Sequence, residues 1–237
     1  MKKVTWLVIL TVLMVLFLPN VFAKPTSIYE KSFATPESAI TYFMKSLKNN
    51  KISNAFKACA VNDYSKKYNF KAFSRRLDSI SYLQSMAPSE YELYVELNKI
   101  ECLARIGKQI KLFYYSILSS ENDLLDTKTK PTNDQIEKFI QTVNPKRLSV
   151  LEVISIDKPL LIDDERYKSN AAASAQCFGA NDVTERVALL KFNNDFYILG
   201  FHLYKFGSSW KIDSLSSPLA NTPMYGVKKI ALNEYIY

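Results

Sequence analysis

The sequence has few of the residues that most metal and nucleotide sites need. It contains one histidine, His202, which excludes zinc sites with two His ligands such as H-E-x-x-H. It contains five glycines, and no two of them have the spacing of G-x-G-x-x-G or of a P-loop. Those motifs need clustered glycines because the backbone must approach a phosphate closely. We therefore expect neither a metal site nor a cofactor.

Cysteine is also scarce. Cys59, Cys102 and Cys177 are far apart in the chain, and no C-x-x-C motif is present. This count excludes a small disulfide-rich scaffold, and its being odd leaves at least one thiol unpaired. Whether two of the three form a disulfide stays open, although buried apolar cysteines are the expected state. A catalytic pair of Cys177 and His202 has no local signature to support it.

The first residues have the layout of a secretory signal peptide. Two lysines precede a long apolar run, and Val21 and Ala23 stand where a signal peptidase cleaves. We expect a signal peptide over 1–23 and a secreted or cell-envelope protein that begins with an exposed linker over 24–34. The alternative is an uncleaved anchor, because the apolar run is only a little shorter than a membrane span of about 20 residues.

Positive charge is concentrated in one segment. The chain has a formal net charge of +8, and nine basic residues against one acidic residue lie between positions 45 and 76. Outside the cytoplasm the available anions are phospholipid head groups and wall polymers, so we expect an anionic membrane or wall polymer as a partner rather than nucleic acid. The alternative is a solvated helix surface. The candidate anion-binding residues are Lys66, Lys67, Arg75 and Arg76.

Helical signals occupy the first part of the chain. Thr35, Pro36 and Glu37 have the pattern of a helix start. Ser89 and Glu92 have the spacing of a capping box, which predicts the start of the longest helix. The apolar residues of that helix recur at helical spacing and predict its buried stripe: Leu93, Leu97, Ile100, Ala104, Ile110, Phe113 and Ile117.

The periodicity then changes to that of strands. Runs over 183–192, 196–206 and 210–217 are separated by short turns, which predicts an antiparallel meander. Helices followed by strands indicate an α+β fold, with N-terminal helices packed on a curved antiparallel sheet and an extra long helix. We expect one domain over 35–237, mainly helical over 35–146 and mainly sheet over 147–220, with a C-terminal tail over 221–237.

Two stretches carry a resemblance to a known superfamily. The helical start "TPESAITYFMKSLKNNKISNAFKACA" and the sheet ending "GSSWKIDSLSS" resemble uncharacterised exported bacterial proteins of the NTF2-like (SnoaL-like) superfamily. The resemblance implies a curved sheet wrapped around helices and a cone-shaped cavity. It implies no particular reaction, because this fold serves enzymes, transport factors and interaction modules.

The strand over 196–206 has one wholly apolar face and one mixed face. Leu199, Phe201 and Leu203 lie on the apolar face and are expected to pack against the helices. His202 and Tyr204 lie on the mixed face, which Glu185 of the preceding strand could join to line a cavity for a small apolar or amphipathic ligand. The alternative is a histidine that is solvated or satisfied by one hydrogen bond.

Three functions are compatible with these patterns. The leading hypothesis is a non-catalytic extracytoplasmic module that binds a ligand or a partner at the cell envelope. The second is a cavity-based hydrolase or isomerase that uses His202 as acid or base, assisted by Tyr204 or Glu185. The third is a structural envelope protein held by an uncleaved signal anchor.

Overall fold

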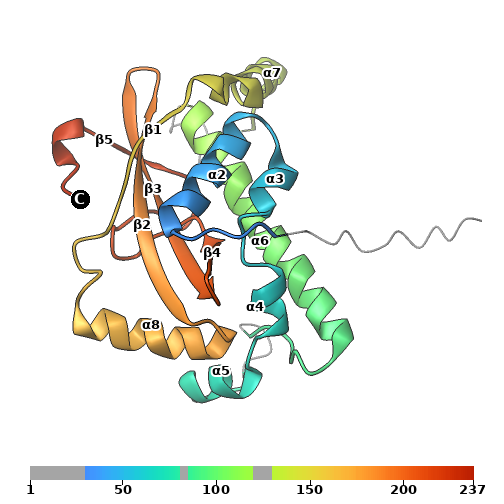
Figure 1. The fold of residues 1–237 in the computed structure, drawn as a ribbon. Helices are drawn as coiled ribbons and strands as arrows, with labels where there is room; N and C mark the ends of the chain where they lie inside the picture. Colours follow the sequence, from blue (N-terminus) through green and yellow to red (C-terminus); the bar gives the residue numbers. More distant parts are fainter. Residues whose placement is uncertain (1–29, 81–84, 120–129) are drawn as a thin grey trace, which may run out of the picture.

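A curved antiparallel sheet stands at the centre of the protein, and most of the helices lie to one side of it (Figure 1). The structure, a computed structural model, describes residues 30–80, 85–119 and 130–237. The expected signal peptide over 1–23 and the larger part of the expected linker lie outside the described residues. The mixed α+β architecture and the curved antiparallel sheet agree with the expectation from the sequence.

The elements follow the order that the sequence indicates, with helices first and the sheet after them. The helices before the sheet are α2 (Pro36–Lys48), α3 (Ile52–Phe56), α4 (Asn62–Lys66), α5 (Phe70–Arg76), α6 (Glu92–Leu118) and α7 (Asn133–Thr142). The remaining elements are η2 (Pro145–Val150), β1 (Glu152–Asp157), α8 (Glu165–Phe178), β2 (Asp182–Phe192), β3 (Asp195–Phe206), β4 (Ser209–Ser214), β5 (Lys228–Ile230) and η3 (Leu232–Glu234).

The three expected strands are present as β2, β3 and β4, which pair in sequence order, although β4 ends at Ser214 rather than at residue 217. The turn between β2 and β3 contains Asn193, whose φ of 55° is the left-handed conformation that hairpin turns require. β1 extends the sheet beyond β2, and the short β5 pairs with the edge of β3 that β4 leaves uncovered. On the outer side of β4, Cys59 forms a parallel bridge with Ile212. The segment between α3 and α4 therefore lies along this edge of the sheet.

Local capping explains two of the helix starts. Thr35 caps α2, and its hydroxyl accepts a hydrogen bond from the Ser38 amide at 3.1 Å, as the sequence predicts. Thr132 caps α7 in the same way through Gln135. The predicted capping box of α6 is wrong, because Tyr91 is the N-cap residue and the Ser89 hydroxyl donates instead to the Tyr68 carbonyl at 2.6 Å.

The predicted buried stripe of α6 is wrong in its first half. Leu93 and Ile100 are 69% and 62% exposed, and Leu97 and Ala104 also face solvent. The buried face of this half carries Asn98, whose side-chain amide exchanges two hydrogen bonds with the Ala87 backbone at 2.8 and 2.9 Å. Asn98 lies on a buried stripe with Val95, Cys102 and Ile106, so its bonds to buried backbone help to turn this side of the helix inward instead of the predicted one. The second half follows the prediction and buries Ile110, Phe113 and Ile117.

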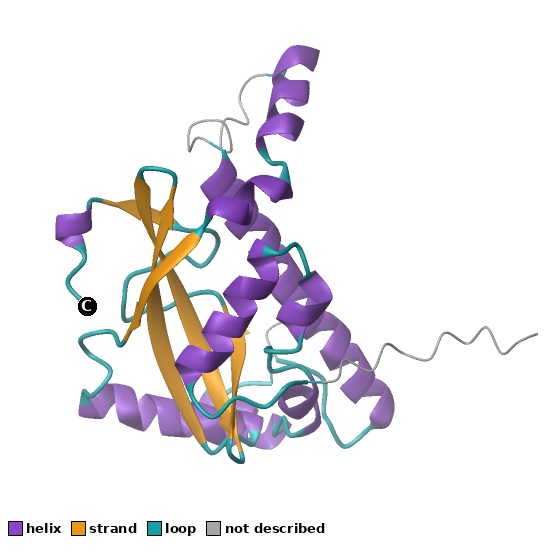
Figure 2. Ribbon diagram, turned by 45° about the horizontal axis from the view of Figure 1, so that its top comes forward, coloured by secondary structure: helices purple, strands orange, loops and turns teal. Residues whose placement is uncertain are grey.

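The sheet is covered on both faces. On one face Phe201 of β3 meets Phe43 of α2 edge to face, with the ring centroids 6.1 Å apart. This confirms that Leu199, Phe201 and Leu203 pack against the helices. On the other face Val187, Leu189 and Ile198 form a smaller cluster with Ala220, against which the C-terminal Tyr235 and Tyr237 pack. Figure 2 shows the C-terminal end of the chain beside the sheet.

The N-terminal segment and the C-terminal tail are both attached to the body. Phe33 is 6% exposed, and its carbonyl accepts a hydrogen bond from the Trp210 amide at 2.9 Å. Phe33 of the expected linker is therefore packed, whereas Lys31, Ser32 and Ala34 are exposed as expected. The Tyr237 hydroxyl donates to the Ala220 carbonyl at 2.7 Å, so the tail folds back on the sheet. Among the described residues, no helix combines the length and the apolar character that a membrane span needs.

Candidate functional site

Glu185 lies on the mixed sheet face, where the register places it opposite His202. It is 4% exposed and accepts hydrogen bonds from the Ser217 hydroxyl at 2.6 Å and from the Leu219 amide at 3.1 Å. The segment that it holds also lies against Gly200, where an added Cβ would stand 2.2 Å from the Ser217 nitrogen. Glu185 therefore fastens the chain after β4, and this part of the expected cavity face is filled by backbone.

His202 is held by a buried carboxylate. Its Nδ1 lies 3.3 Å from Oδ2 of Asp213, the residue at the irregularity in β4. Oδ1 of Asp213 accepts from Nη2 of Arg105 at 2.7 Å, and its carbonyl accepts from Nη1 at 3.0 Å. Burial raises the pKa of the Asp213 carboxyl, but the Arg105 charge and the His202 hydrogen bond outweigh it and lower that pKa well below its usual range.

Tyr204 lies on the same face but contributes to the interior. It is 2% exposed, and its hydroxyl shares a hydrogen bond of 2.8 Å with the Ser174 hydroxyl of α8. Its ring packs against Phe178 and Tyr64, with centroid distances of 5.2 and 5.5 Å. The three predicted site residues are thus near one another but have different partners. Glu185 binds the chain after β4, His202 lies against Asp213, and Tyr204 bonds Ser174 of α8.

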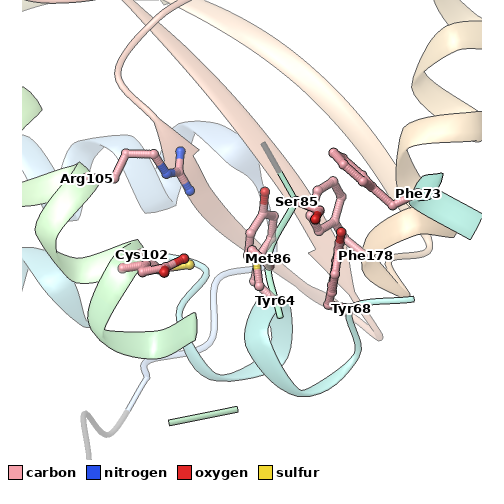
Figure 3. A pocket seen from close by; sticks show the side chains of 9 residues that line it. Tyr64, Tyr68, Phe73, Ser85, Met86, Cys102, Arg105 and Phe178 are labelled. Carbon is pink, nitrogen blue, oxygen red and sulfur yellow. The ribbon is translucent and has the colours of Figure 1, made fainter. Parts of the chain in front are cut away.

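The rings of Tyr64 and Phe178 also line a cavity of about 440 Å³. α4, α5, α6, the end of α8 and the chain before α6 contribute its walls (Figure 3). None of the three residues predicted for the cavity face lines it. The lining residues are Tyr64, Tyr68, Phe73, Ser85, Met86, Glu101, Cys102, Arg105 and Phe178.

Aromatic rings make the wall rigid. Tyr64 and Phe178 stack with their centroids 4.1 Å apart and their planes 10° from parallel. Phe73 meets Phe178 edge to face at 6.2 Å, and Tyr68 packs against Phe73 and Phe178. The sequence signal for this wall is the alternation of aromatics and cations in "DYSKKYNFKAF". That alternation does not reveal the contribution of Phe178, which comes from a helix 100 residues further along.

Tyr68 carries the most unusual polar group of the cavity. The residue is 2% exposed, and its hydroxyl has no hydrogen-bond partner in the part of the chain that the structure describes. Burial raises the pKa of this hydroxyl well above its usual range, and a contact of its oxygen with the Met86 backbone acts in the opposite direction without offsetting it. The hydroxyl therefore keeps its proton at neutral pH, and that proton has no acceptor among the described residues. A buried hydroxyl without a partner is costly, and a ligand could satisfy it.

The predicted anion-binding residues lie beside the cavity on α4 and α5. Lys66, Arg75 and Arg76 are exposed to solvent. Lys67 pairs with Asp63 at 3.1 Å, and its ammonium lies 5.2 Å from the centroid of the Phe206 ring. All four cations are thus exposed to solvent, and the charge of Lys67 is partly neutralised by Asp63.

The three cysteines are buried and free, so no disulfide forms between them in this structure. Burial raises the pKa of the Cys59 and Cys102 thiols, which keeps them protonated and poorly nucleophilic. The Cys177 thiol donates to the Ala173 carbonyl of its own helix. Over the described residues, no group of three His, Cys, Asp or Glu side chains is placed to hold a metal ion.

No protein-family model and no curated protein matches this chain. A crystal structure of a cystatin-like protein from Ruminococcus gnavus is similar, with a TM-score of 0.52 and 22% sequence identity. The similarity covers 83% of this chain and 44% of that protein, so the chain spans less than half of its length. At this identity the likeness concerns the fold alone: an α+β arrangement like that of a cystatin-like protein.

Proposed function

We propose that this protein is a non-catalytic binding module that holds a small apolar or amphipathic ligand in the aromatic cavity between α4, α5, α6 and α8. The cavity volume of about 440 Å³ carries the proposal, because it falls within the range of about 300–1,000 Å³ typical of ligand sites. Aromatic rings form one wall of the cavity, and the polar side chains of Ser85, Glu101 and Arg105 lie among the other lining residues, a combination that can bind the apolar and the polar part of one ligand. We also propose that the fold is NTF2-like and that the protein is exported and acts outside the cytoplasm.

The alternative of a cavity-based hydrolase or isomerase has less support. His202 and Asp213 form an oriented pair, but neither of them lines the cavity. Asp213 is bound by Arg105 through both a side-chain and a backbone contact, which explains the pair as part of the packing of α6 on β4. A ligand in the cavity would therefore not meet the His202–Asp213 pair.

Filling the cavity tests the proposal. Ser85 lines the cavity, and Ser85→Trp places an indole in the space that a ligand would use. We expect the neutral fluorescent probe N-phenyl-1-naphthylamine to bind the native protein, and the variant to weaken that binding at least about tenfold, a loss of about 1.4 kcal/mol. Fluorescence titration measures both values.

The matched control adds a tryptophan elsewhere. Ser53 is exposed on α3 and does not line the cavity, so Ser53→Trp should leave the affinity for the probe unchanged. The proposal is wrong when the native protein does not bind the probe, or when Ser85→Trp binds it as tightly as Ser53→Trp does.

A second binding function is favoured by the exposed cations of α4 and α5. Leu77 and Ile80, which follow α5, are 41% and 77% exposed beside these cations. Cations next to exposed apolar side chains suit the surface of an anionic membrane. We propose this surface as a weak membrane contact that accompanies ligand binding.

Removing four charges tests this contact. We expect the quadruple change of Lys66, Lys67, Arg75 and Arg76 to Gln to reduce sedimentation with anionic phospholipid vesicles at 0.1 M salt about tenfold or more. Binding of the native protein should decline toward 1 M salt, where the Debye length falls from about 10 to about 3 Å. The control changes four exposed lysines elsewhere, Lys130, Lys138, Lys146 and Lys228, to Gln. Equal losses from the two sets would mean that net charge alone is responsible.

A further inference from the structure

We infer that the ligand of the aromatic cavity is an amphiphile with a single anionic head group, an inference that rests on the proposed function. The aromatic wall selects the apolar body of the ligand, as argued above. The sign of the head group follows from the polar groups that the cavity and its rim present. The lining contributes the hydroxyls of Tyr64, Tyr68 and Ser85, the Arg105 guanidinium and the exposed Glu101 carboxylate. A second guanidinium, that of Arg76, follows the lining residue Phe73 on α5.

The buried hydroxyl of Tyr68 requires an acceptor. Its ring is fixed between Phe70, Phe73 and Phe178, with centroid distances of 5.5 to 6.4 Å, so the hydroxyl cannot turn away to solvent. Figure 3 shows the hydroxyl ends of Tyr64 and Tyr68 pointing toward the same side of the cavity. An acceptor oxygen on the ligand would give the Tyr68 hydroxyl the partner that the described residues do not supply.

Arg105 supplies a positive charge in the wall. A guanidinium has five N–H donors in a fixed fork, and Asp213 receives one bond from each of Nη1 and Nη2. The guanidinium also lies 5.8 Å from the centroid of the Tyr64 ring, so its plane is part of the lining. Because the side chain is 38% exposed, the cation can still be reached from the cavity. Arg105 is thus held in place by Asp213 and keeps donors for an oxyanion.

Arg76 adds a second cation at the rim. It follows Phe73 by three residues on α5, a spacing that puts the two side chains on one helix face. Burial and the Asp213 charge raise the pKa of the Tyr204 hydroxyl, and the charges of Arg76 and Arg105 act in the opposite direction, so the positive charge of Arg76 reaches the aromatic rings that Tyr204 shares with the cavity wall. Arg75 is equally exposed, but its position one residue earlier points it away from Phe73.

One acidic residue opposes these cations. Glu101 lines the cavity one turn before Arg105, but it is exposed to solvent, where water screens its charge. Asp213 does not line the cavity and is already bound by Arg105 and His202. The donors inside the cavity therefore outweigh the single acceptor at its edge, which favours an anion over a neutral or cationic head group.

Two probes with the same aromatic body test the sign of the head group. 8-Anilinonaphthalene-1-sulfonate carries a sulfonate that N-phenyl-1-naphthylamine lacks, and both increase in fluorescence on entering an apolar site. We expect the sulfonate to bind the native protein at least about tenfold more tightly than the neutral probe. We expect Arg76→Gln to weaken the sulfonate about three- to fivefold and Arg75→Gln less than about twofold, as for partly screened ion pairs. Neither variant should change the affinity for the neutral probe.

Two further variants test the polar groups of the cavity. Tyr68→Phe removes only the hydroxyl and should weaken the sulfonate about threefold or more, while it preserves the ring contacts. Glu101→Gln should tighten the sulfonate, and Glu92→Gln, an exposed change at the start of the same helix, should not. Thermal melting of each variant checks that the fold is retained.

The outcomes separate this inference from the proposed function. Equal affinities for the two probes, or equal losses from Arg75→Gln and Arg76→Gln, would overturn the anionic head group while the cavity remained a ligand site. A sulfonate that binds equally to native protein and to Ser85→Trp would place it outside the cavity and overturn both. Tighter sulfonate binding that Ser85→Trp abolishes and Arg76→Gln weakens would support both.

Discussion

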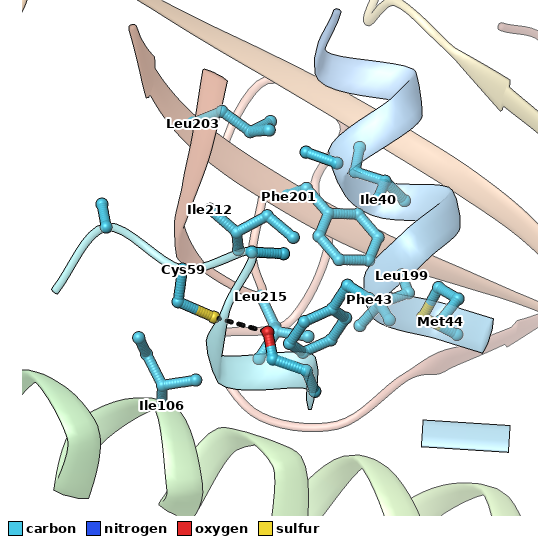
Figure 4. Packing of buried hydrophobic residues seen from close by; sticks show 14 of the residues in the cluster. Ile40, Phe43, Met44, Cys59, Ile106, Leu199, Phe201, Leu203, Ile212 and Leu215 are labelled. Carbon is cyan, nitrogen blue, oxygen red and sulfur yellow. Dashed lines mark hydrogen bonds between the residues drawn. The ribbon is translucent and has the colours of Figure 1, made fainter. Parts of the chain in front are cut away.

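Replacing Leu203 with Asp is expected to unfold the protein at room temperature. Leu203 is fully buried between the sheet and the helices, beside Phe201 and Ile212 (Figure 4). The change removes a buried isobutyl group and places a carboxylate where the packing offers no partner, which together cost at least about 4 kcal/mol. Domains of this size are stable by about 5–15 kcal/mol, so the lower estimate already removes much of that stability, and the burial of an unpaired carboxylate, which costs more than this lower estimate, unfolds the protein. Urea denaturation followed by circular dichroism measures the loss.

The control for this change is Leu93→Asp on α6. The apolar periodicity of the sequence predicts that Leu93 is as buried as Leu203, whereas the structure leaves it 69% exposed. We therefore expect a change of less than about 0.5 kcal/mol, the usual size for an exposed substitution. A cost at Leu93 similar to the cost at Leu203 would mean that the orientation of α6 is the one that the sequence predicts.

The sheet could be predicted because each strand carries its own signals. The alternation of apolar with mixed side chains along β3 and the Asn193–Asn194 turn are local features, and they fix which residues of the strand share a face. α6 could not be predicted in the same way, because it has apolar residues on two sides. The choice between them is made by Asn98 and Gln109, whose side chains bond backbone groups at Ala87 and Leu215. Those partners lie on other parts of the chain, and residue spacing does not reveal them.

The candidate site was predicted only in part. The sequence indicates that Glu185, His202 and Tyr204 share a sheet face, and the register agrees. It does not indicate that the segment over 215–220 folds back over Gly200, because this depends on a close approach of two backbones. The cavity itself is assembled from separate helices, so single residues such as Tyr68 and Arg105 have no pattern that would mark them.

Replacing Arg105 with Gln is expected to destabilise the protein by about 2 kcal/mol at pH 7. Breaking a buried ion pair usually costs about 3–5 kcal/mol, because the remaining charge loses its partner. The expected cost is lower here because Arg105 is 38% exposed and water screens part of the interaction. In an Asp213→Asn background the same change should cost much less, which a double-mutant cycle would show. Equal costs in both backgrounds would mean that the two side chains are not coupled.

The same ion pair should make the free energy of unfolding fall as the pH is lowered into the acid range. The pKa of the Asp213 carboxyl in the folded protein lies well below the value of about 3.9 for an unperturbed Asp. The unfolded chain therefore takes up this proton first as the pH falls, so the stabilisation is complete above about pH 4 and is lost as the pH drops through the folded-state pKa. Arg105→Gln removes a main cause of the low pKa, so the free energy of unfolding of the variant should decline less steeply below pH 4 than that of the native protein. Lys168→Gln breaks only the exposed pair with Glu165 and should follow the native curve. Native and Arg105→Gln curves that run parallel below pH 4 would contradict the role given to Arg105, because the acid loss would then come from other carboxylates.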